Sequence, residues 1–421
     1  GEITSRVRLA AGELSPYVMR LFPRLTPMLE ATGVRTEEGN TGDQSLYYEA
    51  AARFLSALGV QFGGALWIFD EAHWLDAASG QVLAGIARQR TSLPIHLLCL
   101  IQTNETANPT RFTRDLAELA DVTVTLAELD LGEVSQLATA HLGTGSVDAD
   151  LARELLARAG GNPLTIREYL RSMLEVGVLW PNWGTWQLDF DGLSNLALPN
   201  DVAGLLLARL ERASDAVCDA LRKAALLGSE FRPSDLAELC ALSEHALDTT
   251  LGEAIEEHLL DRPSEDCCRF VHEMVRDRLE AQVPAEQRAG LHRRIAGILR
   301  ARLTSDDSVL FGCAEHAFLG ADAATAAQAY EFTLRAGQRA QAGFANDAAC
   351  AFLLRAEQLV DEYALPRTYE LCQSLATSLA QVGRLDESLP RIKQADALCD
   401  DPIERAEMHL RAAEAVFFNR N

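Results

Sequence analysis

Two adjacent carboxylates, Asp70 and Glu71, directly follow a short apolar run, Ala65–Phe69. That run is typical of a buried parallel strand, which would carry both acids at its carboxyl end. There, one carboxylate can hold Mg²⁺ through water, while the other orients the water that attacks a phosphoryl group. The pair predicts nucleotide hydrolysis, with Asp70 and Glu71 catalytic and Asp70 the Mg²⁺ ligand. Many strands end in solvated acids, however, so the pair alone also fits a purely structural strand end.

The residues around the two acids predict the α/β layer that would position them. A helix is expected at Ser79–Arg88, a second buried strand at Ile95–Ile101 and a third strand at Val122–Leu126. Strands and helices that alternate at this spacing are typical of a sheet whose ligands bind at the strand ends. Ahead of the first strand, a further helix is expected through Leu46–Leu58.

From about residue 129 onward the apolar pattern becomes helical, with few strands. The expected helices are Gly132–Leu142, Asp148–Ala159, Ile166–Val176 and Glu273–Gln282. The tract Trp180–Asp191, which is rich in tryptophan, predicts a short hairpin or an irregular loop, and Phe270-Val271 predicts a strand.

After residue 300 the chain becomes rich in alanine and contains an internal repeat. The stretches Ala340–Val360 and Ala380–Ala397 correspond at a spacing of about 39–40 residues, and each holds a glycine, Gly343 or Gly383. Small residues that recur where two helices approach indicate stacked helical hairpins of a solenoid. A plain helical bundle is the alternative.

The acidic composition restricts the functions open to the chain. Its 421 residues carry 38 Lys+Arg and 61 Asp+Glu, a formal charge of −23. This length predicts two to four domains, and the excess of acids argues against a broad nucleic-acid surface. No apolar run approaches the roughly 18–20 residues that cross a bilayer, so no membrane association is expected. The 9 cysteines form no CxxC pair and indicate free thiols in a reducing compartment, the cytoplasm.

The segment Leu66–Asp76 is similar to the Walker B region of STAND-type signal-transduction ATPases, which include relatives of the maltose-regulon activator and large LuxR-type ATP-binding regulators. Further motifs follow in the order of that family. Gly160–Leu164 resembles its Gly-Asn-Pro-Leu, Leu198–Phe231 the start of its winged helix, and Arg269–Glu273 its Phe-x-His-(Asp/Glu). Motifs in a fixed order are more specific than any one of them alone.

The resemblance implies a truncated α/β core of the P-loop NTPase type, followed by an all-α lid, a winged helix and a tetratricopeptide-like α-solenoid. The corresponding domains are residues 1–127, 128–198, 199–300 and 301–421. Of these, the nucleotide-binding domain would be partial and the repeats incomplete. The family also implies ATP or ADP and Mg²⁺ as cofactors.

The resemblance assigns nucleotide contacts beyond the acidic pair. Pro163, with Gly161 beside it, would lie against the base, and His272 would touch the β-phosphate of ADP and lock a closed state. Asn104 follows the sensor strand, where many relatives carry arginine; an amide can hydrogen-bond a phosphate but brings no positive charge. Structural interpretations also exist: Pro163 can belong to a helix turn, and His272 can be a satisfied core or surface histidine.

The phosphate-binding loop of the family is missing from the sequence. No Gly-x-x-x-x-Gly-Lys-Ser/Thr occurs, and the only lysines, Lys223 and Lys393, lie outside any glycine loop. Without the loop and its lysine, a triphosphate loses its main electrostatic partner. We therefore expect a fragment that begins after its P-loop, binds ATP poorly and barely hydrolyses it. The other reading is a family member that has discarded nucleotide binding.

The expected function is the regulatory core of an ATP/ADP-switched signal-transduction ATPase, as part of a bacterial transcriptional regulator. An inducer or protein partner would bind the helical repeats, and the ATP state would self-associate. Residues 201–300 hold 13 Lys+Arg and 19 Asp+Glu, a net charge of −6, so the winged helix is not expected to read DNA. Any contact with DNA would come from an output domain absent from this chain.

Two alternatives remain at this stage. One is a degenerate, non-hydrolysing scaffold that binds a protein partner through its repeats. The other is a regulatory region fused to a kinase or a nucleotide cyclase.

Overall fold

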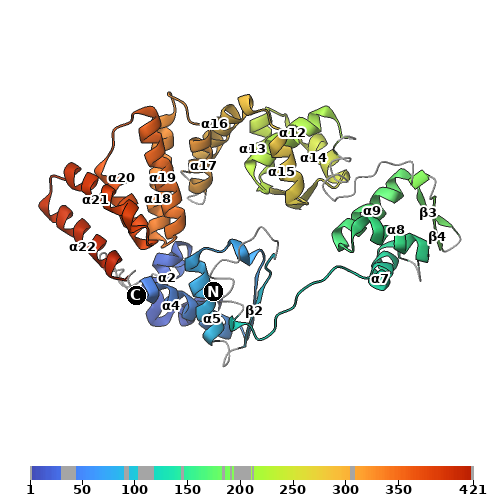
Figure 1. Cartoon of the computed structure of the whole chain (residues 1–421), viewed down its shortest axis with the longest axis horizontal. Coiled ribbons are helices and arrows are strands. Elements are labelled where there is room, and N and C mark those ends of the chain that lie inside the picture. The colour runs from blue at the N-terminus through green and yellow to red at the C-terminus, as the bar shows by residue number, and fades with distance from the viewer. Residues whose placement is uncertain are drawn as a thin grey trace. The chain divides into compact units, whose positions relative to one another are not determined.

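The computed structural model describes residues 2–29, 44–89, 94–102, 118–143, 147–182, 185–189, 192–193, 210, 213–303 and 309–418. The described chain is mostly helical, with a few short strands (Figure 1). It divides into two compact units. Unit 1 comprises Gly1–Thr123 and Leu310–Asn421, and unit 2 comprises Val124–Val309.

The amino-terminal part of unit 1 is a small α/β layer. Its elements are α1 (Glu2–Ala11), α2 (Ser15–Leu21), α3 (Thr26–Leu29), α4 (Gln44–Gln61), β1 (Ala65–Phe69), α5 (Ala77–Gln89) and β2 (Ile95–Cys99), with short 3-10 turns η1 (Gly12–Leu14), η2 (Pro23–Leu25) and η4 (Ala72–Trp74). The strands β1 and β2 pair in parallel, with Ala65 opposite Ile95 and Phe69 opposite Cys99. The predicted first strand is thus confirmed, and so are the helices before and after it.

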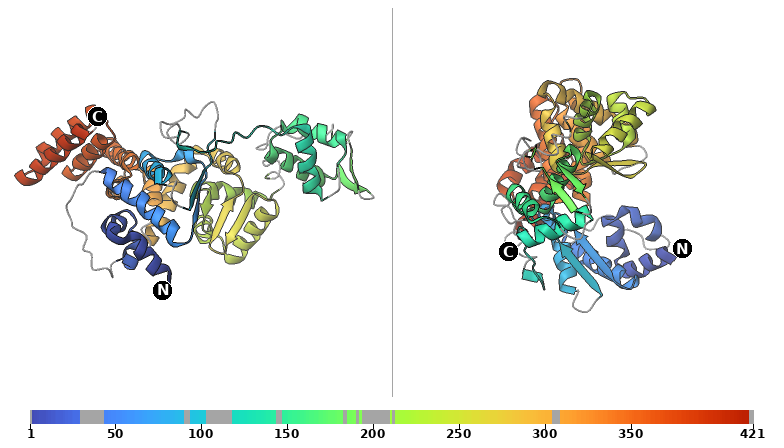
Figure 2. Two further views of the ribbon diagram at one scale, coloured as in Figure 1. Left: turned by 90° about the horizontal axis from the view of Figure 1, so that it is seen from below. Right: turned by 90° about the vertical axis from the view of Figure 1, so that its right-hand side faces the viewer.

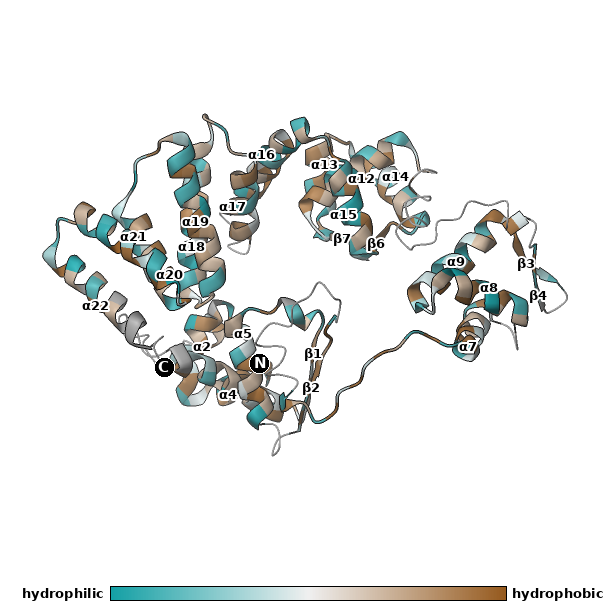
Figure 3. Ribbon diagram, viewed as in Figure 1, coloured by the Kyte–Doolittle hydropathy of each residue, from teal (hydrophilic) through white to brown (hydrophobic). Residues whose placement is uncertain are grey.

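One face of the β1–β2 sheet is covered and the other is bare in the described part of the chain. Ala52 of α4 and two residues of α5, Leu83 and Ile86, are buried with Ile95 in one apolar cluster. On the opposite face, the apolar side chains Leu66, Ile68 and Leu98 are 60%, 58% and 47% exposed. In Figure 3 both strands are coloured largely brown, which marks hydrophobic residues. Parallel sheets are normally buried on both faces, so this half-covered sheet is unusual.

The predicted third strand, Val122–Leu126, is wrong. Residues 122–130 have no regular structure, and Val122, Val124 and Leu126 are 77%, 74% and 87% exposed. A strand is stabilised by hydrogen bonds to a neighbour, and no described strand pairs with this segment. The second strand also ends at Cys99, two residues before the predicted Ile101, because its described partner β1 ends at Phe69, opposite Cys99.

Unit 2 begins with three helices and a hairpin. These are α7 (Leu131–Leu142), α8 (Ala149–Ala159), α9 (Pro163–Val176), β3 (Leu179–Asn182) and the antiparallel β4 (Thr185–Leu188). Asp130 and Glu133 form a reciprocal capping box that starts α7, which satisfies two backbone amides at the helix end. The predicted helices and the tryptophan-rich hairpin are confirmed.

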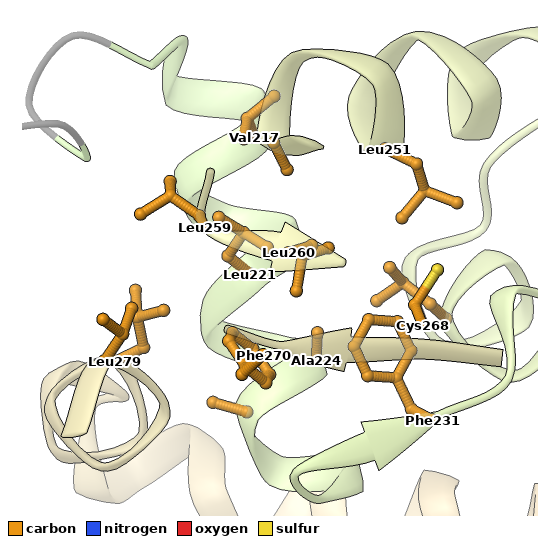
Figure 4. Close-up of a cluster of buried hydrophobic side chains, with 14 of the residues drawn as sticks. Val217, Leu221, Ala224, Phe231, Leu251, Leu259, Leu260, Cys268, Phe270 and Leu279 are labelled. Atoms are coloured by element: carbon orange, nitrogen blue, oxygen red, sulfur yellow. The ribbon is translucent and has the colours of Figure 1, made fainter. Parts of the chain in front are cut away.

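The rest of unit 2 combines helices with a small antiparallel sheet. Its elements are α12 (Asp215–Leu227), β5 (Glu230–Phe231), α13 (Pro233–Cys240), α14 (Glu244–Glu256), β6 (Leu260–Ser264), β7 (Cys267–Phe270), α15 (Glu273–Gln282) and α16 (Ala285–Arg302). The strand order is β5-β7-β6. Its core, shown in Figure 4, buries the rings of Phe231 and Phe270, whose centroids are 5.9 Å apart, against α12 and α14. The predicted helix after β7 is confirmed.

Stacked helices form the carboxyl-terminal part of unit 1 (Figures 1 and 2). They are α17 (Leu310–Leu319), α18 (Ala326–Ala342), α19 (Asn346–Tyr363), α20 (Tyr369–Gln381), α21 (Leu385–Leu398) and α22 (Pro402–Phe418). Turns at Gly343 and Gly383 close the α18–α19 and α20–α21 hairpins, as the repeat predicts. Among the described helices, none is long and apolar enough to cross a membrane.

A buried ionic triad joins the repeats. Glu357 on α19 accepts hydrogen bonds from Arg367, at 2.7 Å, and from Arg391 on α21, at 2.8 Å. Burial alone would raise the pKa of the Glu357 carboxyl, but these two arginines hold that pKa below its ordinary value. The charged form of Glu357 therefore stabilises the stack of helices.

Gly337→Ala should destabilise the α18–α19 hairpin by about 1–3 kcal/mol, because the added Cβ would lie 2.6 Å from Cγ of the buried Leu353. Gly297→Ala on α16 is the control: its Cβ would meet nothing within 4 Å, so higher helix propensity should stabilise by about 0.5–1 kcal/mol. Urea unfolding of the two variants measures both effects. Equal effects of the two substitutions would contradict the close helix crossing.

Glu357→Gln should lower the free energy of unfolding by about 1–3 kcal/mol at pH 7, because two arginines lose their charged partner. Because the pKa of Glu357 is lowered in the folded state, its charge contributes its full stabilisation above pH 4.5, the ordinary pKa of a glutamate. That stabilisation is lost as the pH falls through the folded-state pKa. Unfolding curves of both proteins between pH 3 and pH 7 should therefore converge toward the acid end. A difference that stays constant over this range would refute the charged role.

Candidate functional site

The two predicted catalytic acids lie together in the turn after β1. Asp70 and Glu71 are both exposed, and the Glu71 amide donates a 3.0 Å hydrogen bond to the Asp70 carboxylate. Glu71 adopts a left-handed backbone conformation, with φ of 50°. Such a conformation is uncommon for a residue other than glycine and is found where the surroundings impose it, often at functional sites.

Hydrogen bonds from the residues that follow β2 hold this turn in place. The Leu100 amide donates to the Phe69 carbonyl at 2.9 Å, and the Ala72 amide donates back to the Leu100 carbonyl at 2.8 Å. The Gln102 amide reaches Nδ1 of His73 at 3.4 Å. The turn that carries Asp70 and Glu71 is therefore fixed between the carboxyl ends of two parallel strands, where ligands of α/β sheets bind.

A third acid of the segment has a structural task. The Asp76 carboxylate accepts a 2.7 Å hydrogen bond from the Ser79 amide and so satisfies the start of α5. This leaves Asp70 and Glu71 as the exposed carboxylates of the segment, and hard oxygen ligands that coordinate through water suit Mg²⁺. Within the described residues, no group of three or more His, Cys, Asp or Glu side chains is arranged to hold a metal ion.

The acidic turn can hold the Mg²⁺ that accompanies a nucleotide, but the α/β layer provides no lysine for the nucleotide's phosphates. The lysines lie elsewhere, Lys223 on α12 and Lys393 on α21, and the Lys223 ammonium is paired with Asp219. Neither lysine therefore belongs to the elements of the α/β layer that carries Asp70 and Glu71. A bound triphosphate would need positive charge from other groups.

The Gly160–Leu164 motif forms the junction between α8 and α9. Gly160 ends α8 in a left-handed conformation, Asn162 caps α9 by accepting from two amides at 2.9 and 3.1 Å, and Pro163 is the first residue of α9. Gly161 also has a positive φ, of 75°. Only glycine fits at this position, because a Cβ would lie 2.6 Å from the Leu129 carbonyl oxygen. The first four residues of the motif thus each have a structural task, and Pro163 is exposed.

His272 lies at the junction between β7 and α15. It is half-buried and precedes the first residue of α15, and its carbonyl accepts from the Val275 amide at 3.0 Å. The adjoining loop is bonded to the same junction: Ser229 Oγ lies 3.2 Å from Glu273 Oε1 and accepts from Arg276 at 2.6 Å. His272 therefore sits in a polar, well-anchored turn of unit 2.

The predicted site residues divide between the two units. Asp70 and Glu71 are brought together in unit 1, whereas Gly161, Pro163 and His272 belong to unit 2. Asn104 lies outside the described residues. Within unit 2, Gly161 and Pro163 are neighbours at one helix junction, and His272 belongs to the part built around β5, β6 and β7.

One pocket of unit 2 was not singled out from the sequence. It has a volume of about 330 Å³ and lies between β5, α13 and α16, with an apolar floor that includes Phe231 and Ile295. The Asp235 carboxylate on its wall is paired with Arg302 at 2.7 Å. Burial raises the pKa of Asp235, although Arg302 and Arg232 act in the opposite direction. The end of α12, the β6–β7 turn and the start of β7 contribute to its lining as well. Residues that converge from so many elements leave no local sequence pattern, so nothing in the sequence marks this pocket.

The chain was compared with known families and structures. A family model described as a domain of unknown function (DUF8739) matches residues 132–177, which lie in the α7–α9 part of unit 2. No curated protein matches the chain. Among solved structures, the chain is similar to a STAND protein (signal transduction ATPase with numerous domains) with a tetratricopeptide repeat sensor from Pyrococcus horikoshii. The identity is 13% and the TM-score 0.47, over 96% of this chain and 57% of that one, so this chain spans little more than half of that protein.

Gly161→Ala should destabilise unit 2 by more than about 2 kcal/mol, because strain at positive φ adds to a collision with the backbone of Leu129. Gly143→Ala is the matched control, since Gly143 also has a positive φ, of 64°, but a Cβ there meets nothing within 4 Å. It should cost only about 1 kcal/mol. Thermal unfolding of both variants separates the two contributions, and equal losses would show that the close approach to Leu129 is unimportant.

Proposed function

We propose that this chain is the regulatory core of a nucleotide-switched signalling ATPase of the STAND class. The observation that carries the proposal is the Asp70-Glu71 turn at the carboxyl end of β1, fixed to β2 by hydrogen bonds in both directions. An acidic pair at this edge of a parallel sheet suits Mg²⁺-dependent phosphoryl chemistry. The left-handed conformation of Glu71 supports a functional role for the two acids, over the alternative that they are merely solvated residues at a strand end.

In this proposal Asp70 holds Mg²⁺ through water and Glu71 orients the attacking water. Mg²⁺ supplies charge neutralisation at the phosphates when it is bound. Pro163, with Gly161, lies against the base, Asn104 hydrogen-bonds a phosphate, and His272 senses the β-phosphate of ADP. These four contacts are proposed from the family resemblance, and the structural tasks of Gly161 and Pro163 are compatible with them.

The half-covered sheet supports a larger nucleotide-binding domain. Leu66, Ile68 and Leu98 form an exposed apolar face, whereas parallel sheets are normally covered on both sides. We propose that further elements of the domain, including a P-loop, cover this face and provide the lysine that the acidic edge lacks. Nucleotide binding then requires these elements as well as Asp70.

The helices α7–α9 would be the lid of the switch, and the following part of unit 2 its winged helix. The order helix, strand, two helices and two strands, from α12 to β7, supports the winged-helix assignment. Its net charge of −6 over residues 201–300 favours a role in sensing nucleotide over one in binding DNA.

The helical repeats would receive an inducer or a protein partner. Because nucleotide and partner then prefer different states of one element, binding at the repeats would favour exchange of ADP for ATP and self-association. Output in a bacterial transcriptional regulator would come from a DNA-binding domain outside this chain, in the cytoplasm.

A scaffold without nucleotide chemistry is the second candidate. It is favoured by the Gly160–Leu164 motif, whose first four residues each have a structural task, and by the absence of lysine from the α/β layer. In that case the repeats bind a partner and the acidic turn is merely a strand end.

Calorimetry of ADP and ATP binding with Mg²⁺ distinguishes the two candidates. The protein at its native length should bind both nucleotides, whereas residues 1–421 alone should bind them at least 10-fold more weakly because the phosphates lack a lysine. Asp70→Ala should weaken the Mg²⁺-dependent part of binding, and His272→Ala should weaken ADP more than ATP.

One control variant accompanies this experiment. Asp76→Asn, which alters an acid that caps α5, should leave nucleotide affinity within about 2-fold. Failure of the native-length protein to bind either nucleotide would refute the switch and leave the scaffold.

A further inference from the structure

The turn between α18 and α19 docks on the amino-terminal α/β layer of unit 1. Phe344 of this turn is buried in one cluster with Tyr47 and Tyr48 of α4. The Phe344 and Tyr47 rings lie with centroids 4.4 Å apart, and the Tyr48 hydroxyl donates to the Phe344 carbonyl at 3.4 Å. The two partners are separated by 296 residues in the sequence.

A cation completes this cluster. The Arg20 guanidinium of α2 lies 5.2 Å from the ring centroid of Tyr47 and 5.2 Å from that of Phe344. It also donates to the Tyr47 hydroxyl at 2.9 Å, which fixes its position over both rings. Cation–π contacts of this kind add to the burial of the rings. Phe344 is therefore received by a site built from α2 and α4.

Phe344 holds a strained backbone conformation. Its φ is 61°, in the left-handed region that a bulky residue rarely adopts. The corresponding turn 39 residues later has the same hydrogen bond, from Arg384 to Leu379 as from Ala345 to Ala340, and there the left-handed residue is Gly383. Glycine is the natural residue for this turn, so phenylalanine is unfavourable locally and is stabilised by docking.

The docking site belongs to the elements that position the candidate acids. The cluster includes Ala78 and Val82 of α5, the helix that begins after the Asp70-Glu71 turn. The helices α4 and α5 also form the covered side of the β1–β2 sheet. A displacement of the Phe344 turn would therefore alter packing on the helices that support the acidic edge.

We propose that the Phe344 turn is a releasable clasp that couples the helical repeats to the candidate nucleotide site. Its regulatory output rests on the proposed function, whereas the clasp itself does not. A partner that binds the repeats and prefers the undocked turn would open the clasp and loosen α4 and α5.

Two features favour release over a permanent joint. The contact is small: the Phe344 ring packs on Tyr47 beside the Arg20 cation, and one 3.4 Å hydrogen bond joins the Tyr48 hydroxyl to the Phe344 carbonyl. Two acids, Asp76 beside α5 and Asp347 on α19, belong to the two sides of the contact. Burial, with these two charges, raises the pKa of the Tyr48 hydroxyl to about 12. The like charges of the two acids oppose the contact, and the Arg20 cation offsets part of that opposition.

Hydrogen exchange of the full chain, followed by mass spectrometry, tests the clasp. Phe344→Gly removes the ring but suits the turn, so the repeats should stay folded while exchange in α4 and the start of α5 rises about 10-fold. Phe352→Ala is the matched control, because it removes a ring of α19 that packs on Phe311 instead. It should leave exchange in α4 unchanged. In the double variant Tyr47→Ala/Phe344→Gly, exchange in α4 should be no faster than in whichever single variant exchanges faster, because both substitutions break the same contact.

Unchanged exchange in α4 after Phe344→Gly would overturn the clasp, and so would an equal effect of Phe352→Ala. In the native-length protein, Phe344→Gly should also accelerate ADP release, and an unaltered rate would overturn the coupling. If no nucleotide binds at all, the proposed function fails, whereas the exchange result still decides the clasp.

Discussion

The parallel pairing of β1 with β2 is the interaction on which the candidate site depends. Five residues of each strand align without a bulge, and this register brings the ends of both strands to one edge of the sheet. The Asp70-Glu71 turn owes its position to reciprocal bonds between Phe69, Leu100 and Ala72. Parallel strands need a crossover element, which α5 provides, and α5 in turn starts from the cap formed by Asp76. The sheet, its crossover helix and the acids thus form one structural unit.

The acidic turn and the Gly160–Leu164 motif show why functional and structural explanations of a motif have to be separated. Gly161 and Pro163 are explained by a close backbone approach and a helix start, so their presence alone is no sign of a ligand. Glu71 differs. It precedes the 3-10 turn η4 in a left-handed conformation, but its side chain makes no capping hydrogen bond to that turn. The acidic turn is therefore the stronger support for nucleotide chemistry, and the Gly160–Leu164 motif adds to it only through the family resemblance.

Much of the fold could be predicted from local patterns, and the exceptions have physical causes. The strand Ala65–Phe69 and the helix Glu273–Gln282 were predicted with their observed ends, because apolar runs and helix-forming residues act locally. The prediction of a strand at Val122–Leu126 was wrong, because alternating apolar residues form a strand only beside a neighbouring strand. The Phe344 contact has no local signal either. Only the 39-residue register, which sets Phe344 against Gly383, marks that position as unusual.

ATP turnover by the native-length protein and its Glu71→Gln variant tests most directly the proposal that Asp70 and Glu71 serve Mg²⁺-dependent hydrolysis. The variant should retain ATP binding but lose turnover by about 100-fold or more, since the attacking water loses the group that orients and polarises it. Turnover that survives this substitution unchanged would refute the proposed role of Glu71, and a native-length protein that neither binds nor hydrolyses ATP would refute nucleotide chemistry at this edge altogether.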